Sequence, residues 1–324
     1  MKQAVSEVRE VLERLFVHRG ASEVDARIFA DVLIEAELRG RPTHGLNRVD
    51  GLLRTIESQP DRRPRIVTET GSVLVVDGED HSGYVVGAFL ADEALRVAGR
   101  EGHVLAAARN TRHCGMLGYY ADRIVQSGFI AVCFADCAPW VTPWGAADCV
   151  LGTNPVAAAF PAAPHPVLID MGTSAITYGA VDIAGRSGAS IPPDVALDAG
   201  GRATTDPGNV AVVLPFGGHR GYALGLLVQL LSGVLSGAAG VPEDRRDYGL
   251  FMLVMKPNLF APREAYEASL AELLSRIRSA RPIKPGAKVL VPGDRAYAER
   301  DRRMIEGIEI DEAEWKRLLD RKER

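Results

Sequence analysis

Arg39-Gly40-Arg41-Pro42-Thr43-His44-Gly45-Leu46-Asn47-Arg48 places a histidine among glycines and arginines at the point where a predicted helix ends. A second stretch of this kind, Asn110-Thr111-Arg112-His113-Cys114-Gly115, follows a predicted strand. Histidine is the side chain most easily poised to exchange a proton near neutral pH. The planar guanidinium of Arg48 suits a carboxylate. Together the two stretches predict an enzyme that acts on a small acid.

Helices are expected before the first stretch. Apolar side chains recur at helical spacing over residues 5–16, and Gly20 ends this helix. Ser22 then caps a second helix, with Asp25 at the N3 position of a capping box. This second helix delivers the chain to His44.

The rest of the chain alternates between strand-like and helical segments. Strands are expected at residues 65–77, closing on the turn pair Asp77-Gly78, and at 104–108, 130–135, 156–160, 167–171 and 251–255. Helices are expected at 85–100, at 222–235, at 264–280 with Leu270, Leu273, Leu274 and Ile277 inward, and in the tail, where Trp315 and Leu318 dock. Gly217-Gly218 opens the 222–235 helix, which is apolar enough to predict burial on most sides. Residues 185–209 read as a long surface excursion.

Composition bounds the class of protein. The 324 residues predict roughly two domains or one large interwoven one. A formal net charge of −4 disfavours a nucleic-acid partner. The start turns acidic without an apolar h-region, and the longest apolar stretch is too short to span a bilayer, so neither a signal peptide nor a membrane partner is expected. Cys114, Cys133, Cys137 and Cys149 lack paired-ligand spacing, which favours free thiols and a cytoplasmic location.

Nucleotide and metal motifs leave alternatives open. Neither G-x-G-x-x-G after a strand nor G-x-x-x-x-G-K-[ST] occurs. The glycines at 217–218 followed by Arg220 at a helix start fit a pyrophosphate, and they fit a tight turn before a closely packed helix equally well. A zinc site from His44, His113 and Cys114 is disfavoured, because adjacent residues would struggle to ligate one tetrahedral ion.

The order of several short motifs resembles the malate/L-lactate dehydrogenase family, which does not use a Rossmann fold. The resemblance covers nearly the whole chain, although no single motif is specific. It rests on Leu38-Arg39-Gly40 with Thr43-His44-Gly45, His113-Cys114-Gly115, Pro143-Trp144-Gly145, Leu151-Gly152-Thr153-Asn154-Pro155, Asp170-Met171-Gly172-Thr173-Ser174, Gly217-Gly218-His219-Arg220-Gly221-Tyr222, and Pro292-Gly293-Asp294.

The resemblance implies a fold and a set of site residues. The fold class is α/β (α+β), with a central, largely antiparallel or mixed sheet flanked by helices and an N-terminal helical region. The implied division is residues 1–70 with 296–324, 71–118 with 281–295, and a cofactor-binding domain at 119–280. His113 and His44 match the acid/base positions. The implied substrate contacts are Arg48, Thr153 and Asn154, and the implied contacts to NAD or NADP are Cys137, Asp170, Met171, Gly172, His219, Arg220, Gly293, Asp294 and Arg295. Members are usually homodimers.

Departures from the family pattern concern the substrate more than the cofactor. Arg220 stands where a lysine is usual, Gln229 where an acidic residue is usual, and Leu52 where a tyrosine is frequent. We expect a nicotinamide-dependent oxidoreductase acting on a small 2-oxo or 2-hydroxy acid. The alternatives are a reductase of cyclic 2-imino acids, such as a piperideine or pyrroline carboxylate, and a dimer that binds a dinucleotide without turnover. Retention of both His44 and His113 argues against that last alternative.

Overall fold

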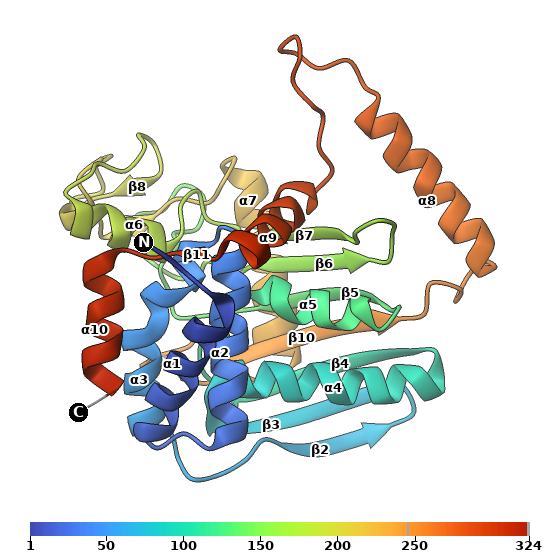
Figure 1. Cartoon of the computed structure of the whole chain (residues 1–324), viewed down its shortest axis with the longest axis horizontal. Coiled ribbons are helices and arrows are strands. Elements are labelled where there is room, and N and C mark those ends of the chain that lie inside the picture. Colours follow the sequence, from blue (N-terminus) through green and yellow to red (C-terminus); the bar gives the residue numbers. More distant parts are fainter. Residues whose placement is uncertain (245, 323–324) are drawn as a thin grey trace.

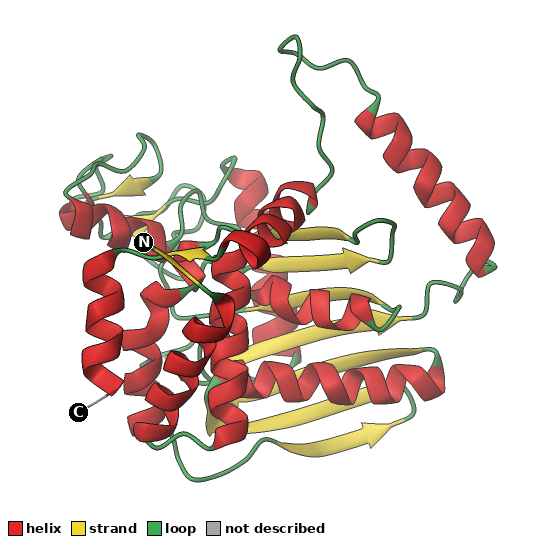
Figure 2. Ribbon diagram, viewed as in Figure 1, coloured by secondary structure: helices red, strands yellow, loops and turns green. Residues whose placement is uncertain are grey.

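The computed structural model describes residues 1–244 and 246–322, which fold around a mixed seven-stranded sheet (Figures 1 and 2). The strand order is β2-β3-β4-β10-β5-β6-β7, and β3 and β4 are the parallel pair in an otherwise antiparallel ladder. The strands of this sheet are β2 (Arg65–Thr70), β3 (Val73–His81), β4 (His103–Thr111), β5 (Ile130–Ala135), β6 (Val156–Phe160), β7 (Val167–Met171) and β10 (Tyr248–Met255). The predicted fold class is confirmed.

Helices cover the sheet and form a bundle at one of its ends. They are α1 (Val5–His18), α2 (Glu23–Leu38), α3 (Val49–Ser58), α4 (Gly83–Glu101), α5 (Leu117–Gln126), α6 (Tyr178–Ser187), α7 (His219–Val228), α8 (Arg263–Arg278), α9 (Asp294–Glu306) and α10 (Glu312–Lys322). Short helical turns are η1 (Pro42–His44), η2 (Leu46–Arg48), η3 (Pro207–Asn209) and the π-helical η4 (Gln229–Leu235). Small two-stranded sheets pair β1 (Lys2–Gln3) with β11 (Ile308–Glu309) and β8 (Ala196–Leu197) with β9 (Val212–Val213).

Two hydrophobic cores hold these layers together. The first lies between the sheet and the helices α4 and α5, with Tyr120, Leu90 and Met252 among its fully buried members. The second joins α1, α2, α3 and α10 at the end of the sheet (Figure 1) and includes Phe16 and Phe29, whose rings meet edge to face at 5.6 Å. The loops that follow α2 and β4 leave elements that border these cores, so the cores set the positions of both loops.

Local signals in the sequence predicted several of these elements correctly. The Ser22 side chain caps α2 by accepting a hydrogen bond from the Asp25 backbone amide at 3.1 Å. Residues 130–135, 156–160 and 167–171 form strands with the predicted bounds, because short apolar runs between Pro and Gly have no room for a helix. Trp315 and Leu318 of α10 are buried, as predicted.

Other predictions were wrong. The turn between β2 and β3 lies at Gly71, whose φ is +55°, and Asp77-Gly78 lies inside β3. Gly78 serves close packing there, since a Cβ on it would lie 2.7 Å from the Asn110 carbonyl oxygen.

The predicted 222–235 and 264–280 helices are less buried than expected. The α7–η4 helix exposes one apolar face, made by Leu226, Leu227, Leu230, Val234 and Leu235, with Leu235 65% exposed. In α8, Leu274 is buried whereas Leu273 is 54% exposed, because this helix extends away from the body of the molecule (Figure 1). It contacts the body through Tyr266, which donates to the Pro161 carbonyl.

Two glycines provide a matched test of the packing. A Cβ on Gly249 of β10 would lie 1.5 Å from the Ser232 carbonyl oxygen of η4, whereas a Cβ on Gly99 of α4 meets nothing within 4 Å. Gly249→Ala should therefore destabilise the fold by about 2–3 kcal/mol through overpacking. Gly99→Ala should stabilise it by up to about 1 kcal/mol, because alanine is the better helix former. Urea unfolding of both variants measures this, and equal midpoints would contradict the packing of η4 on β10.

Candidate active site

Two consecutive turns after α2 present His44 and Arg48. The first, η1, contains His44, and the second, η2, ends at Arg48. The turns are tied to α2 by Glu37, whose carboxylate accepts a hydrogen bond from the Leu46 backbone amide at 2.8 Å. Gly45 is required between them, because a Cβ there would overlap the Glu37 carboxylate at 2.0 Å. Burial raises the pKa of Glu37, so this anchor is sensitive to its surroundings.

The Arg48 guanidinium is oriented by its own turn. Its Nε donates to the Thr43 carbonyl at 2.7 Å, and the Thr43 hydroxyl lies 3.0 Å from His44 Nδ1. One Nη lies beside Gly179 of α6, where a Cβ would approach it to 2.8 Å. Among the described residues, neither Nη has a hydrogen-bond or ion-pair partner. This leaves two parallel donors, which is the arrangement that binds a carboxylate.

His113 is held by the loop between β4 and α5. The Gly115 backbone amide donates to His113 Nδ1 at 3.1 Å. In the neutral ring, Nδ1 therefore lacks a proton and Nε2 carries it. The Tyr84 ring packs against the imidazole, with centroids 6.0 Å apart. His113 thus has one nitrogen fixed by the backbone and the other free to meet a ligand.

A second anchor fixes the chain just before His113. Arg112 makes a two-pronged ion pair with Asp80, at 2.9 and 2.8 Å, and also donates to the Ser58 hydroxyl at 2.8 Å. Gly83 at the start of α4 allows the Arg112 carbonyl to approach, since a Cβ there would lie 2.0 Å from that oxygen. The Asp80–Arg112 ion pair therefore joins β3, α3 and the His113 loop.

The structure brings His44, His113 and Arg48 into one electrostatic cluster. Burial lowers the pKa of His44 to about 4, and the charges of Arg48 and Arg41 contribute to this shift. The His113 ring is open to solvent on one side, but the protein packed around it and the charges of Arg48 and His44 lower its pKa well below the usual value. Both imidazoles are therefore neutral at pH 7 in the free protein.

A second group of predicted residues lies around the β5 and β7 exits. The Cys137 thiol lies 3.5 Å from the Thr153 hydroxyl, and the Thr173 backbone amide donates to the Thr153 carbonyl at 2.9 Å. The pKa of the Cys114 thiol is raised by burial and then by Cys137, Asp136 and Asp170. Since Cys114 follows His113, these contacts place the second group beside the histidine loop.

Asp170, Met171 and Gly172 line the end of β7. Burial raises the pKa of Asp170, while the charge of Arg41 and the Gly118 backbone amide counteract the rise. Met171 is 39% exposed. Asn154, which was predicted to contact the substrate, is fully buried. Its side-chain amide donates to the Gly225 carbonyl at 2.9 Å and to Gln229 at 2.8 Å.

Other predicted residues lie at the starts of α7 and α9. His219 and Arg220 are exposed at the start of α7, with no side-chain partner in the described part of the chain. Asp294 is paired with Arg278 of α8 at 2.8 Å and caps the Val291 backbone amide at 2.9 Å. Arg295 is exposed and Gly293 lies against Leu168 of β7. The roles predicted for these residues stay predictions.

Some residues of the site carried no signal in the sequence. Tyr84 reads as an ordinary helical residue, and its contact with His113 comes from the tertiary fold. Trp140 packs edge to face on Tyr178 of α6 at 4.8 Å, and its buried Nε1 has no hydrogen-bond partner among the residues that the structure describes. The buried Ser174 hydroxyl, after Gly172, also lacks a partner. A buried unpaired donor next to a predicted binding residue is a signal that only the structure can give.

These unpaired groups fit a nicotinamide dinucleotide. Trp140 Nε1 and Ser174 Oγ are groups of the kind that hydrogen-bond an amide or a ribose hydroxyl, but both are buried in this structure. Gly217 and Gly218 have φ of +57° and +66°, and a Cβ on Gly217 would meet nothing within 4 Å. The α7 start therefore keeps its backbone amides and Arg220 accessible to a pyrophosphate.

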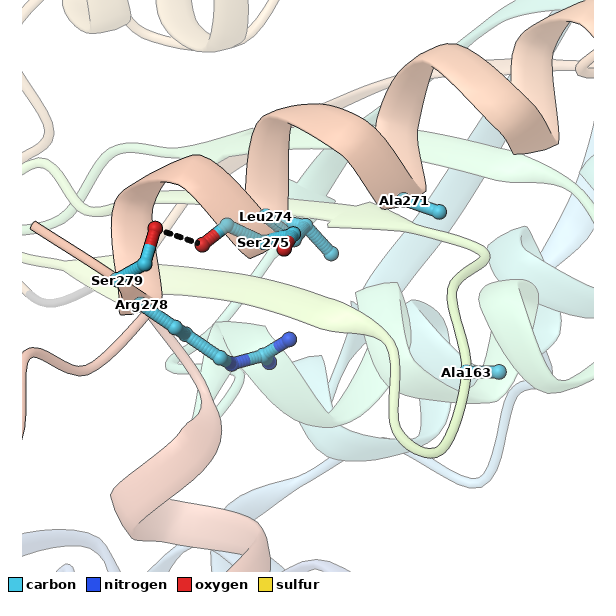
Figure 3. Close-up of a pocket in the computed structure, with 6 residues that line it drawn as sticks. All are labelled: Ala163, Ala271, Leu274, Ser275, Arg278 and Ser279. Carbon is cyan, nitrogen blue, oxygen red and sulfur yellow. Dashed lines mark hydrogen bonds between the residues drawn. The ribbon is translucent and has the colours of Figure 1, made fainter.

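A cavity of about 500 Å³ lies elsewhere, between α8 and the β6–β7 turn (Figure 3). Its lining is Ala163, Ala271, Leu274, Ser275, Arg278 and Ser279. It contains neither a histidine nor a carboxylate, so it is not the reaction site. In the described ranges, no three His, Cys, Asp or Glu side chains are grouped to hold a metal ion. Nor does any described helix combine the length and apolar character needed to cross a membrane.

Comparison with known proteins supports the predicted resemblance. The sequence profile of the malate/L-lactate dehydrogenase family matches residues 4–319. The chain is 35% identical to L-sulfolactate dehydrogenase from Methanothermobacter thermautotrophicus, over 98% of this chain and 96% of that protein. It is 30% identical to the Delta(1)-pyrroline-2-carboxylate/Delta(1)-piperideine-2-carboxylate reductase of Pseudomonas putida, over 97% of this chain and 95% of the relative.

Solved structures give the same result. A dehydrogenase from Sinorhizobium meliloti superimposes with a TM-score of 0.92 at 34% sequence identity, covering 99% of this chain and 98% of that one. The profile match spans both histidine stretches and nearly the whole fold. The chain is therefore an oxidoreductase that belongs to the malate/L-lactate dehydrogenase family.

Proposed function

We propose that this protein transfers hydride between a nicotinamide dinucleotide, NAD or NADP, and a small 2-oxo or 2-hydroxy acid. The observation that carries the proposal is the Arg48 guanidinium, which is fixed at Nε and unpaired at both Nη atoms beside two neutral imidazoles. Relatives named for sulfolactate, and others named for malate, are dehydrogenases of acids of this class.

Arg48 holds the substrate carboxylate in this proposal. A bound carboxylate offsets the Arg48 charge, which in the free protein lowers the pKa of both histidines. The substrate thus raises the pKa of the group that must protonate it. The His113 ring then takes up a second proton at Nδ1, giving up the hydrogen bond from the Gly115 amide, and Nε2 donates its proton to the oxygen that gains charge, while His44 hydrogen-bonds the substrate or relays the proton. Bound nicotinamide supplies or accepts the hydride.

The proposed cofactor contacts are those implied by the family resemblance. Cys137 and residues 170–172 lie beside the histidine loop, and the α7 start offers backbone amides with Arg220. Thr153 is kept as a substrate contact. We place the protein in the cytoplasm, since all four cysteines are free.

A homodimer is part of the proposal. The apolar face of α7–η4 is exposed in the single chain, and Val73 and Leu105 of the neighbouring strands β3 and β4 are also exposed, at 43% and 42%. Exposed apolar surface of this kind marks an association site. Family members are usually homodimers, and a second copy would cover this surface.

A second candidate activity is reduction of a cyclic 2-imino acid, as the Pseudomonas putida relative is named for. An imine that arrives protonated needs no proton from His113. The assay that tests both activities is a panel of 2-oxo acids and cyclic imines, each run with NADH and with NADPH and followed by nicotinamide absorbance. If no member of the panel oxidises NADH or NADPH, the proposal is rejected.

Arg48→Lys tests the carboxylate clamp. A point charge should replace the two-pronged donor, so kcat/KM for the acid should fall by about 10–100-fold, while cofactor affinity stays unchanged. Steady-state kinetics and a cofactor titration measure the two quantities. Lost cofactor affinity with unchanged substrate kinetics would show that Arg48 is misassigned.

Arg220→Ala tests the cofactor site. Loss of a charge-assisted bond should raise the Kd for NAD(P)H by roughly ten- to a hundredfold, about 1.5–3 kcal/mol. Fluorescence titration measures the Kd, with Arg202→Ala, another exposed arginine, as the control. Unchanged affinity in a folded Arg220→Ala protein would reject the placement of the pyrophosphate at α7.

The lowered pKa values of the two histidines predict how the rate of oxidation depends on pH. The pKa of His44 is lowered to about 4 and that of His113 is also lowered in the free protein, so the neutral base needed for oxidation of a 2-hydroxy acid persists below the usual titration range of histidine. The kcat/KM for oxidation should therefore stay level from pH 8 to about pH 5. A fall with a midpoint near 6.5 would contradict the lowered values.

His113→Ala should lower kcat for oxo-acid reduction by roughly 10²–10⁴-fold, and less for a protonated cyclic imine. His44→Ala should affect substrate binding more than the pH profile. If only His44→Ala removes the pH dependence, the two roles are exchanged, and if neither variant changes the rate, the site is wrong.

A further inference from the structure

A chain of buried polar side chains lies behind the Thr153 turn. Gln229 of η4 donates from Nε2 to Asp136 Oδ2 at 3.0 Å and to the Gly240 carbonyl at 3.0 Å. Its Oε1 accepts a hydrogen bond from Asn154 Nδ2 at 2.8 Å. Asp136, Gln229 and Asn154 are 3%, 4% and 0% exposed, so each bond is made away from water.

This chain ties four parts of the fold together. Asp136 follows β5, and its Oδ1 accepts from the Gly249 backbone amide of β10 at 2.6 Å. Gly233 of η4 leaves room for the carboxylate, since a Cβ there would lie 2.7 Å from Asp136 Oδ2. Asn154 stands in the turn before β6. Gln229 is therefore the joint between β5, β10, η4 and that turn.

Asn154 is held and is not free to hold a ligand with its amide nitrogen. Nδ2 donates both to Gln229 and to the Gly225 carbonyl at 2.9 Å, and the backbone φ is +38°, a strained value for a residue other than glycine. The preceding residue, Thr153, meets Cys137 at 3.5 Å. Asn154 thus helps to place Thr153, whose carbonyl is also held by the backbone amide and the hydroxyl of Thr173 at 2.9 and 3.2 Å.

We infer that Gln229 is a positioning residue, which fixes Asn154 and through it places Thr153 and Cys137 at the reaction site. The inference rests on the proposed function, because that function assigns Thr153 to the substrate and Cys137 to the cofactor. An amide suits this joint because it donates to Asp136 and accepts from Asn154 at the same time. A carboxylate at position 229 would face Asp136 with a second acceptor.

The surroundings of Asp136 make that substitution a sharp test. Burial raises the pKa of Asp136 to about 7, and Gln229 and the Gly249 amide counteract the rise. The other titratable groups facing it are Asp247, before β10, and the thiols of Cys114 and Cys137. Two carboxyls at 136 and 229 would share one proton at low pH and repel each other at high pH.

Gln229→Glu should therefore create a new pH dependence. At pH 6 the shared proton restores a donor between the two carboxyls, and kcat/KM should stay within roughly threefold of wild type. At pH 8 kcat/KM should fall by about tenfold or more, because the two ionised carboxylates repel each other and the contact between positions 136 and 229 is lost. Gln126→Glu, at an exposed position of α5, adds the same charge outside the joint and should match wild type at both pH values.

Thiol reactivity gives a readout that does not depend on turnover. Reaction with a disulfide reagent, followed by mass spectrometry of labelled peptides, compares Cys137 with Cys149, a half-buried thiol that serves as internal reference. In Gln229→Glu at pH 8, the ratio of Cys137 to Cys149 labelling should rise several-fold over wild type, because Cys137 loses its fixed neighbour.

The double variant Asp136→Asn/Gln229→Glu exchanges the hydrogen-bond donor and acceptor between positions 136 and 229. The amide introduced at position 136 would donate to the carboxylate introduced at position 229 and accept from Gly249, and that carboxylate would still accept from Asn154, while the bond from Gln229 to the Gly240 carbonyl would not be rebuilt. The double variant should recover both the activity at pH 8 and the wild-type labelling ratio.

Two results would overturn the inference. One is a folded double variant that keeps the defect, and the other is a Gln229→Glu protein with the wild-type pH profile and labelling ratio. If no acid is turned over by the wild type, the proposed function fails, and the labelling ratios still decide the role of Gln229.

Discussion

The Arg48 guanidinium, held at Nε by the Thr43 carbonyl, is the constraint on which the site depends. Burial lowers the pKa of the two neighbouring imidazoles, and the positive charge of Arg48 lowers both further. An unpaired cation in a crowded site is unfavourable until an anion arrives. The same charge therefore selects an acid as ligand and, together with burial, keeps the histidines neutral until that acid binds.

The surrounding fold serves to hold these groups still. Glu37 fixes the His44 turn, the Asp80–Arg112 ion pair fixes the His113 loop, and Gln229 fixes the turn of Thr153. The Glu37 anchor is local, whereas the Asp80–Arg112 and Gln229–Asn154 anchors join segments that are distant in sequence. In each anchor a buried or shielded polar group has its partner.

The sequence predicted those features that are written locally. Short apolar runs gave the strands at 130–135, 156–160 and 167–171, and Ser22 gave the start of α2. The turn predicted at Gly78 was wrong, because this glycine is needed for the close approach of the Asn110 carbonyl on another strand. The histidine stretches and Arg48 could be named because their residue types carry chemistry. Tyr84, Trp140 and the joint at Gln229 could not, because their roles arise from contacts made only in the folded chain.

The central claim is that binding of a carboxylate to Arg48 raises the pKa of a histidine in the site. Calorimetric titration with oxamate, a 2-oxo acid analogue that is not reduced, measures this directly when it is run with NADH near pH 6 in buffers of different ionisation enthalpy. The account predicts net uptake of protons on binding, and loss of that uptake in Arg48→Gln. Binding without proton uptake in the wild-type protein, or with proton release, would contradict it.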